Sequence, residues 1–209
     1  GYIRPFLDKK HFSMFSDTGL TERPDTLASM LCEGRIGIIT DGTPFAIVVP
    51  YLMADYFHVP DDYLTPVYYA TFMRCLRIFC FIVAAVLPGL FVALCLFHPE
   101  VMPSDIMYDI SAAENKTPFP VAVEAIIIHL IYEIVREAGL RMPVAIGHAV
   151  SIVGALVIGD AAVTAGLIAA PMLIVVALTA ISSSVVSRLH ETVAVMRFGF
   201  IIIGGLTGL

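Results

Sequence analysis

Apolar segments long enough to cross a membrane recur through the last two thirds of the chain. Residues 78–97 contain no charged side chain, and the helix that holds them is expected to begin near Leu64. At about 1.5 Å per residue, twenty residues match a hydrocarbon core of about 30 Å. Pro88, in the middle of this run, is expected to kink the helix, which membrane proteins tolerate when a neighbour satisfies the freed carbonyl. The other apolar runs are residues 144–163, 171–186 and 198–209.

The first part of the chain has a different, water-facing pattern. It carries fourteen charged residues up to Asp62, whereas residues 144–209 carry four. Residues 24–32 read as a short helix closed by Gly34, with proline near the first turn. The β-branched runs at 35–40 and 45–49 flank Asp-Gly-Thr-Pro and predict a β-hairpin. We therefore expect residues 1–60 to be the end of a soluble cytoplasmic domain with a hairpin, and 61–209 to be a transmembrane helical domain.

Residues 121–139 form a helix that cannot simply face lipid. His129, Glu133, Arg136 and Glu137 fall within an arc of about 100°, while Glu124 lies on another face near the outer end, where water is close. Ionisable residues inside a membrane helix normally face a partner or a water-filled cavity. One interpretation is a structural ion pair of Glu133 with His129 or Arg136, or a helix lying at the membrane surface. The other is a polar lining for an ion path, with the candidate residues Glu124, His129, Glu133 and Asp160.

Small residues recur at every fourth position of the 144–163 run, and basic residues flank the runs. The small residues form a predicted helix-packing ridge, within the chain or in an oligomer, of Gly147, Ser151, Ala155 and Gly159. If 121–139 crosses the membrane, every basic flank lies on the same side, as expected for the cytoplasm. The acidic and proline-rich segment 98–120, with Ser104 as the N-cap of a short helix, then lies outside. We count four to five membrane helices.

Composition agrees with a membrane protein and excludes several other classes. Apolar residues make up 58% of the chain, charged residues 14%, and the mean hydropathy is +0.89. The net charge of −6 lacks the basic surface of a nucleic-acid-binding protein. The four cysteines show no CxxC pair, the six histidines show no close ligand spacing, and nucleotide-binding and hydrolase motifs are missing from the sequence. We therefore expect no enzyme activity, no cofactor and no metal.

Three stretches carry a resemblance to a known family. They are EGRIGIITDGTP (33–44), PFPVAVEAIIIHLIYEIVREAGL (118–140) and AVSIVGALVIGDAAVTAGLIAAPMLIVVALTAI (149–181). These resemble the A-subunit type of GerA-family spore germination proteins, which include SpoVAF-like members, from about Asp25 onward. The sequence departs from the family pattern at residues 182–191 and at Asp160, where a neutral amide is usual.

The resemblance implies a mainly α, polytopic helical protein of the spore inner membrane with a small α/β remnant at its N-terminus. It also implies an oligomeric ion channel opened by germinants, with B- and C-type subunits as partners. A secondary transporter and a structural scaffold remain alternatives. Because the sequence starts at Gly1 and stops within an apolar run, we expect it to be a fragment, truncated at its C-terminal end.

The predicted orientation can be tested by labelling. In a background without the native cysteines, Asp109→Cys should react with an impermeant reagent from outside, because it follows a span whose basic flank lies inside. Thr43→Cys, in the hairpin turn, should stay unlabelled until the membrane is opened. Labelling at Thr43 alone would invert the topology.

Overall fold

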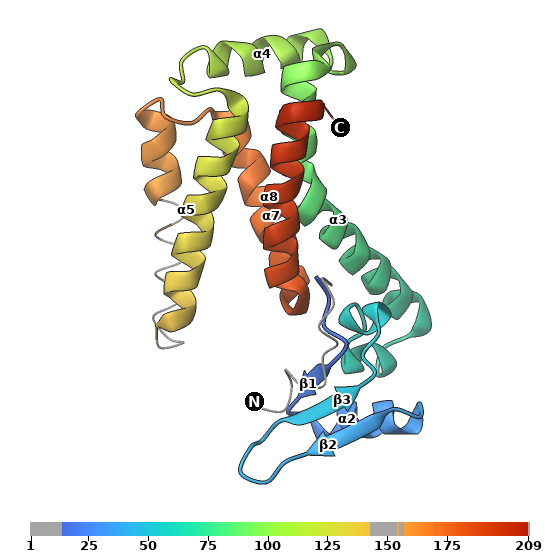
Figure 1. Ribbon diagram of the computed structural model, residues 1–209. Coiled ribbons are helices and arrows are strands. Elements are labelled where there is room, and N and C mark those ends of the chain that lie inside the picture. The colour runs from blue at the N-terminus through green and yellow to red at the C-terminus, as the bar shows by residue number, and fades with distance from the viewer. Residues whose placement is uncertain (1–13, 143–153, 155–156, 209) are drawn as a thin grey trace. The chain divides into compact units, whose positions relative to one another are not determined.

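The chain folds into two compact units that are joined within one long helix. The structure is a computed structural model that describes residues 14–142, 154 and 157–208 (Figure 1). The units comprise residues 1–78 and 79–209, and helix α3 (Val67–Phe97) contains the division. This division reflects packing. The predicted boundary near residue 60 separates a water-facing part of the chain from a lipid-facing part, and it stays a prediction.

The first unit contains a three-stranded antiparallel sheet. Strands β2 (Ile36–Ile39) and β3 (Ala46–Val49) form the predicted hairpin, with Ile38 opposite Ile47 and Gly42 at φ 79° in the turn. A third strand, β1 (Gly19–Thr21), pairs with β3, so β3 is central and is buried at Ile47 and Val48. The sequence analysis missed β1 because three residues are too short to show an alternating pattern.

Helix α2 (Pro24–Cys32) packs against this sheet, as its sequence requires. Proline occupies the first turn, and Gly34 at φ 85° follows the last turn, as predicted. A Cβ at Gly37 of β2 would lie 2.9 Å from Leu27 Cδ1 of the helix. The missing side chain at Gly37 therefore allows α2 to lie close to the sheet.

Two pairs of aspartate and arginine fix the segment that leads into α3. Short 3-10 turns occupy Met53–Tyr56 and Pro60–Tyr63. Arg35 makes two hydrogen bonds to Asp55, one of them 2.8 Å long. Burial acts to raise the pKa of Asp55, but the bonds and charge of Arg35, together with the hydrogen bond from the backbone N–H of Leu52, outweigh it and the pKa is lowered. Arg77 of α3 donates to both oxygens of Asp62, at 2.6 and 2.8 Å, and lowers the pKa of Asp62 to about 2. Each 3-10 turn is thus tied by an ion pair that the sequence analysis did not foresee.

The second unit is a helical bundle. Helix α5 packs against α7 and α8, and α4 lies across one end of the bundle (Figure 1). Its apolar core includes Phe91, Val92, Ile128, Met172 and Ile201. Residues 157–164 are also helical. The named helices are α4 (Ser104–Glu114), α5 (Val121–Arg141), α7 (Ala170–Val185) and α8 (His190–Thr207).

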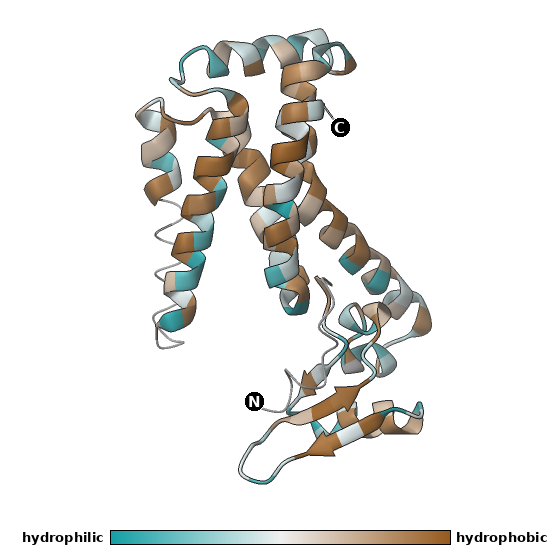
Figure 2. Ribbon diagram, viewed as in Figure 1, coloured by the Kyte–Doolittle hydropathy of each residue, from teal (hydrophilic) through white to brown (hydrophobic). Residues whose placement is uncertain are grey.

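The expected count of four to five membrane helices is not confirmed. Among the described residues, two helices are long and apolar enough to cross a membrane: Val67–Phe97, and Ser187–Thr207, which comprises a 3-10 turn and α8. Helix α7 is apolar but has 16 residues, and α5 carries too many charges. Most of the predicted run 144–163 lies outside the described residues. Apolar residues nevertheless predominate along α3 and α8 (Figure 2).

Three predicted helix starts shift in the structure. Helix α3 begins at Val67 and not near Leu64, and Ser104 is the first residue of α4 after a Pro103 N-cap. The run expected to open at residue 198 belongs to α8, which already begins at His190. This last shift matters most, because it places Arg197 two turns inside a helix.

Helices α3 and α8 touch backbone to backbone. A Cβ built on Gly204 would lie 2.4 Å from the carbonyl oxygen of Gly89, and a Cβ on Gly89 would lie 2.4 Å from the carbonyl oxygen of Phe200. Real Cβ atoms do not approach backbone atoms so closely, so only glycine fits at both positions. The crossing is of the small-residue type known from membrane helices.

A glycine substitution tests this crossing. Gly204→Ala should destabilise the protein by about 1–3 kcal/mol, because the added methyl group overpacks a backbone contact. Unfolding of the protein in detergent would measure the change. Gly199→Ala is the matched control on the same helix, since its Cβ would meet nothing within 4 Å. Equal stability of the two variants would contradict the close crossing.

Candidate functional site

The candidate site lies near the middle of α5, where the buried residues of its N-terminal half give way to the charged residues of its C-terminal half. In its N-terminal half, the core-facing positions include Ala125, Ile128 and His129, at helical spacing. Hydrophilic residues are more frequent toward its C-terminal end (Figure 2). Glu133 lies between the two halves, and its side chain is 17% exposed.

Glu133 is engaged by basic groups from two helices. Arg136, one turn along α5, donates from Nε to Oε2 at 2.8 Å. Arg197 of α8 donates from Nη1 to Oε1 at 3.3 Å. His190 Nε2, at the start of α8, lies 3.9 Å from Oε2. The intrahelical pair with Arg136 is therefore present, and it is extended by a bond between helices.

Arg197 is fully buried and connects three helices. Its Nε donates to the carbonyl oxygen of Ala84 in α3 at 3.1 Å, and its guanidinium lies 5.7 Å from the ring centroid of Tyr132 in α5. Its Nη2 has no hydrogen-bond partner among the described residues. A buried arginine is tolerated only when its charge and donors are largely satisfied, and here Glu133 and Ala84 do most of this.

The carbonyl of Ala84 is available because of Pro88. In an α-helix the N–H of residue 88 would bond to the carbonyl of residue 84, but proline has no N–H. Pro88 lies inside α3, so this carbonyl lacks its normal partner in an apolar environment. Arg197 supplies the missing donor. The predicted tolerance of Pro88 thus has a specific source, while the predicted kink stays a prediction.

His129 does not pair with Glu133 in this arrangement. It is fully buried, its Nδ1 lies 2.9 Å from the carbonyl oxygen of Ala125, and its Nε2 lies 3.4 Å from Thr179 Oγ1 of α7. Thr179 in turn donates to the carbonyl oxygen of Val176. His129 therefore serves as a buried polar contact between α5 and α7.

Glu124 is buried, although the sequence placed it near water. Its exposed fraction is 1%, and Oε1 accepts a short hydrogen bond from the backbone N–H of Ala169, the N-cap residue of α7. The positive end of the α7 dipole also stabilises a carboxylate at this place. Its Oε2 has no hydrogen-bond partner among the described residues. Glu124 thus has a structural role in joining α5 to the start of α7.

The four predicted ion-path residues do not form one cluster. Glu124 and Glu133 are nine residues apart on α5, which corresponds to about 14 Å along the axis. Asp160 is exposed on the helical residues 157–164. Of the predicted ridge, Gly159 is buried and its Cβ would lie 3.2 Å from Leu173 of α7, which indicates a contact within the chain. Gly147, Ser151 and Ala155 lie outside the described residues.

The sequence analysis missed Arg197 as a member of the site. It counted this arginine among the basic flanks, because the apolar run was taken to begin at residue 198. One signal could have pointed to this contact. One apolar helix contains an internal proline, and an arginine lies beside the apolar run of another. Spacing along one helix cannot reveal such a contact between helices.

Comparison with known proteins gives a consistent result along the whole chain. The model of the Bacillus/Clostridium GerA spore germination protein family matches residues 1–209. Spore germination protein KA of Bacillus subtilis (strain 168) is 42% identical over 210 residues, covering 100% of this chain and 39% of that protein. An uncharacterized membrane protein of the same organism, YfkQ, is 39% identical, with coverages of 100% and 41%. Spore germination protein GerQA of Bacillus cereus is 38% identical, with coverages of 100% and 42%.

The chain spans about two fifths of the length of these relatives. No solved structure matches it.

Removal of Arg197 tests the buried pair. Arg197→Met should lower the free energy of unfolding in detergent by about 3 kcal/mol, near the lower end for a broken buried pair, because Glu133 keeps Arg136. Arg141→Met is the matched control, since Arg141 is 80% exposed and forms a surface pair with Glu137. Such a pair contributes at most about 1 kcal/mol. Similar small losses in both variants would show that the network does not hold the bundle together.

Proposed function

The chain belongs to the GerA family of spore germination proteins, and from this premise we propose that it is part of an A-type subunit of a nutrient germinant receptor. In this proposal the protein lies in the spore inner membrane and assembles with copies of itself and with B- and C-type subunits. Its helices form an oligomeric channel that releases cations when a germinant is sensed. It acts as a conduit and not as an enzyme.

The observation that carries the proposal is a charged network inside an apolar helical bundle. Glu133 and Arg136 come from α5, and Arg197 comes from α8, whose residues are otherwise largely apolar (Figure 2). Charged groups at such a depth are costly and usually mark an ion or substrate path. Glu133 keeps a 17% exposed side chain, so it could face a shared axis in an oligomer. Carboxylates repeated around such an axis would favour cations.

The charges around Glu133 fit a resting channel. One carboxylate faces two guanidinium groups at 2.8 and 3.3 Å, so the local charge is positive and opposes cation entry. Conduction then requires that at least one arginine leaves Glu133. In this proposal, germinant sensing favours the conformation in which this carboxylate is free.

One observation favours a second candidate, a structural scaffold. Both carboxylate oxygens of Glu133 already have arginine partners, as expected if the residue only neutralises Arg197. In a scaffold, Glu133 would be needed for assembly and would have no effect on ion flux. The two functions therefore predict different results when charge and assembly are separated.

Two variants separate them in the full-length protein, reconstituted in vesicles with its partner subunits. Glu133→Gln keeps the shape and removes the charge, and germinant-triggered K⁺ flux per assembled protein should fall. The lone change leaves the buried charge of Arg197 without its carboxylate. Glu133→Gln/Arg197→Met removes that charge and should recover part of the lost protein level, although the carbonyl of Ala84 then lacks a donor, and it should still show the reduced flux per assembled protein. Glu137→Gln is the matched control, since this carboxylate is half-exposed on the same helix.

Parental flux and cation selectivity in the assembled double variant would exclude Glu133 as a determinant of the path. That outcome would leave the scaffold function as the better account of the network.

A further inference from the structure

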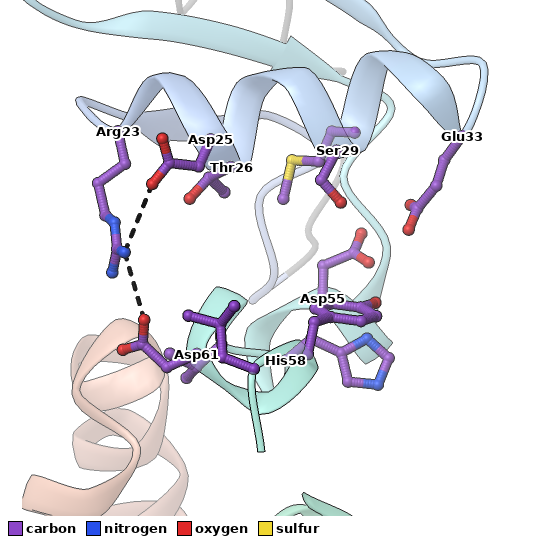
Figure 3. A pocket seen from close by; sticks show the side chains of 12 residues that line it. Arg23, Asp25, Thr26, Ser29, Glu33, Asp55, His58 and Asp61 are labelled. Carbon is purple, nitrogen blue, oxygen red and sulfur yellow. Dashed lines mark hydrogen bonds and ion pairs between the residues drawn. The ribbon is translucent and has the colours of Figure 1, made fainter. Parts of the chain in front are cut away.

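The first unit contains a cavity that the channel proposal does not use. It lies between α2 and the segment that holds the two 3-10 turns, and its volume is about 330 Å³ (Figure 3). This is within the range of small-molecule sites, and at about 30 Å³ per water-sized group it has room for roughly ten non-hydrogen atoms. All its walls belong to residues 23–64.

Negative charge exceeds positive charge around this cavity. Asp61 and Asp25 share Arg23, at 3.2 and 3.7 Å, while Asp55 and Glu33 share Arg35. Four carboxylates therefore have two guanidinium partners. The excess is two negative charges, which favours a cationic guest over an anionic one.

Thr26 gives an independent sign of a missing partner. Its exposed fraction is 4%, it lines the cavity, and its Oγ1 has no hydrogen-bond partner among the described residues. Figure 3 shows its side chain on the cavity side of α2. A buried hydroxyl without a partner costs free energy, and such groups in native proteins usually meet a water or a ligand.

The remaining wall is apolar. Met30, Val59 and Leu64 line the cavity beside the polar groups. A guest would therefore place a charged head near the carboxylates and Thr26, and a short apolar body against these three side chains. Among the described residues no three His, Cys, Asp or Glu side chains lie together so that they could hold a metal ion, and an inorganic cation would leave the apolar wall without a partner.

We propose that this cavity binds a small organic cation, a primary ammonium group on a short apolar body. The ammonium donates to the carboxylates of the cavity and to Thr26 Oγ1. The proposal goes beyond the channel function and does not depend on it. A bound cation would contact the segment 59–64, which contains Asp62. Asp62 pairs with Arg74 and Arg77 of α3 at 3.5 and 2.6 Å, so binding could affect the start of this helix.

The test measures binding of n-butylammonium to the full-length protein in detergent by calorimetry. Butylammonium should bind, whereas n-butyrate and n-butanol, which match its chain but not its charge, should not. Thr26→Val, which keeps the side-chain shape, should weaken binding by about fivefold, the effect of one hydrogen bond. Asp61→Asn should weaken it comparably without unfolding the unit, because Arg23 keeps Asp25.

Asp41→Asn is the matched control, since it removes the same charge from the exposed hairpin turn and should leave the affinity unchanged. The proposal is overturned if the parental protein fails to bind butylammonium or binds butyrate equally well. It is also overturned if neither Thr26→Val nor Asp61→Asn weakens binding. None of these readouts involves ion flux, so failure here is separate from failure of the channel proposal.

Discussion

The hydrogen bond between Arg197 and the carbonyl of Ala84 is the interaction on which the helical unit depends. Pro88 removes the normal donor to that carbonyl, and an apolar bundle offers no water to replace it. A buried guanidinium fills the position but brings a charge, which in turn requires a carboxylate. Glu133 supplies it from α5. One missing N–H thus explains why three helices carry polar groups at this depth.

The same region holds the closest helix contact. Gly89 follows Pro88 directly, and Gly204 lies two turns after Arg197 on α8. Without side chains at these glycines the two backbones can touch, which brings α8 close enough for Arg197 to reach Ala84. The glycine contact and the Arg197 hydrogen bonds therefore hold the same crossing of α3 and α8. A substitution that disturbs one of them should also disturb the other. This coupling also gives the proposed channel a physical basis for two states, because releasing Glu133 from Arg197 weakens a contact that positions α8 against α3 and α5.

The first unit uses ion pairs in a different way. Asp55 and Asp62 each tie a short 3-10 turn to an arginine, and together they fix the segment that becomes α3. The side chains of these pairs are largely buried, with 6–13% exposed, and the lowered pKa of Asp62, about 2, keeps its pair charged at any physiological pH. The segment also forms one wall of the cavity lined by Thr26. A ligand site placed on such a segment would be well suited to regulate the start of α3.

The sequence by itself determined the local elements. Helix α2, the β2–β3 hairpin and the apolar runs of α3, α5 and α7 follow from periodicity, proline and glycine, which act within a few residues of their own position. The same patterns identified Glu133 and its neighbour Arg136, because one helical turn fixes their spacing. Tertiary structure alone decided that Arg197 belongs to this pair, that Glu124 joins α7, and that β1 completes the sheet. Each of these contacts joins residues at least twenty-five positions apart, and no spacing rule along the chain specifies which distant groups packing will bring together.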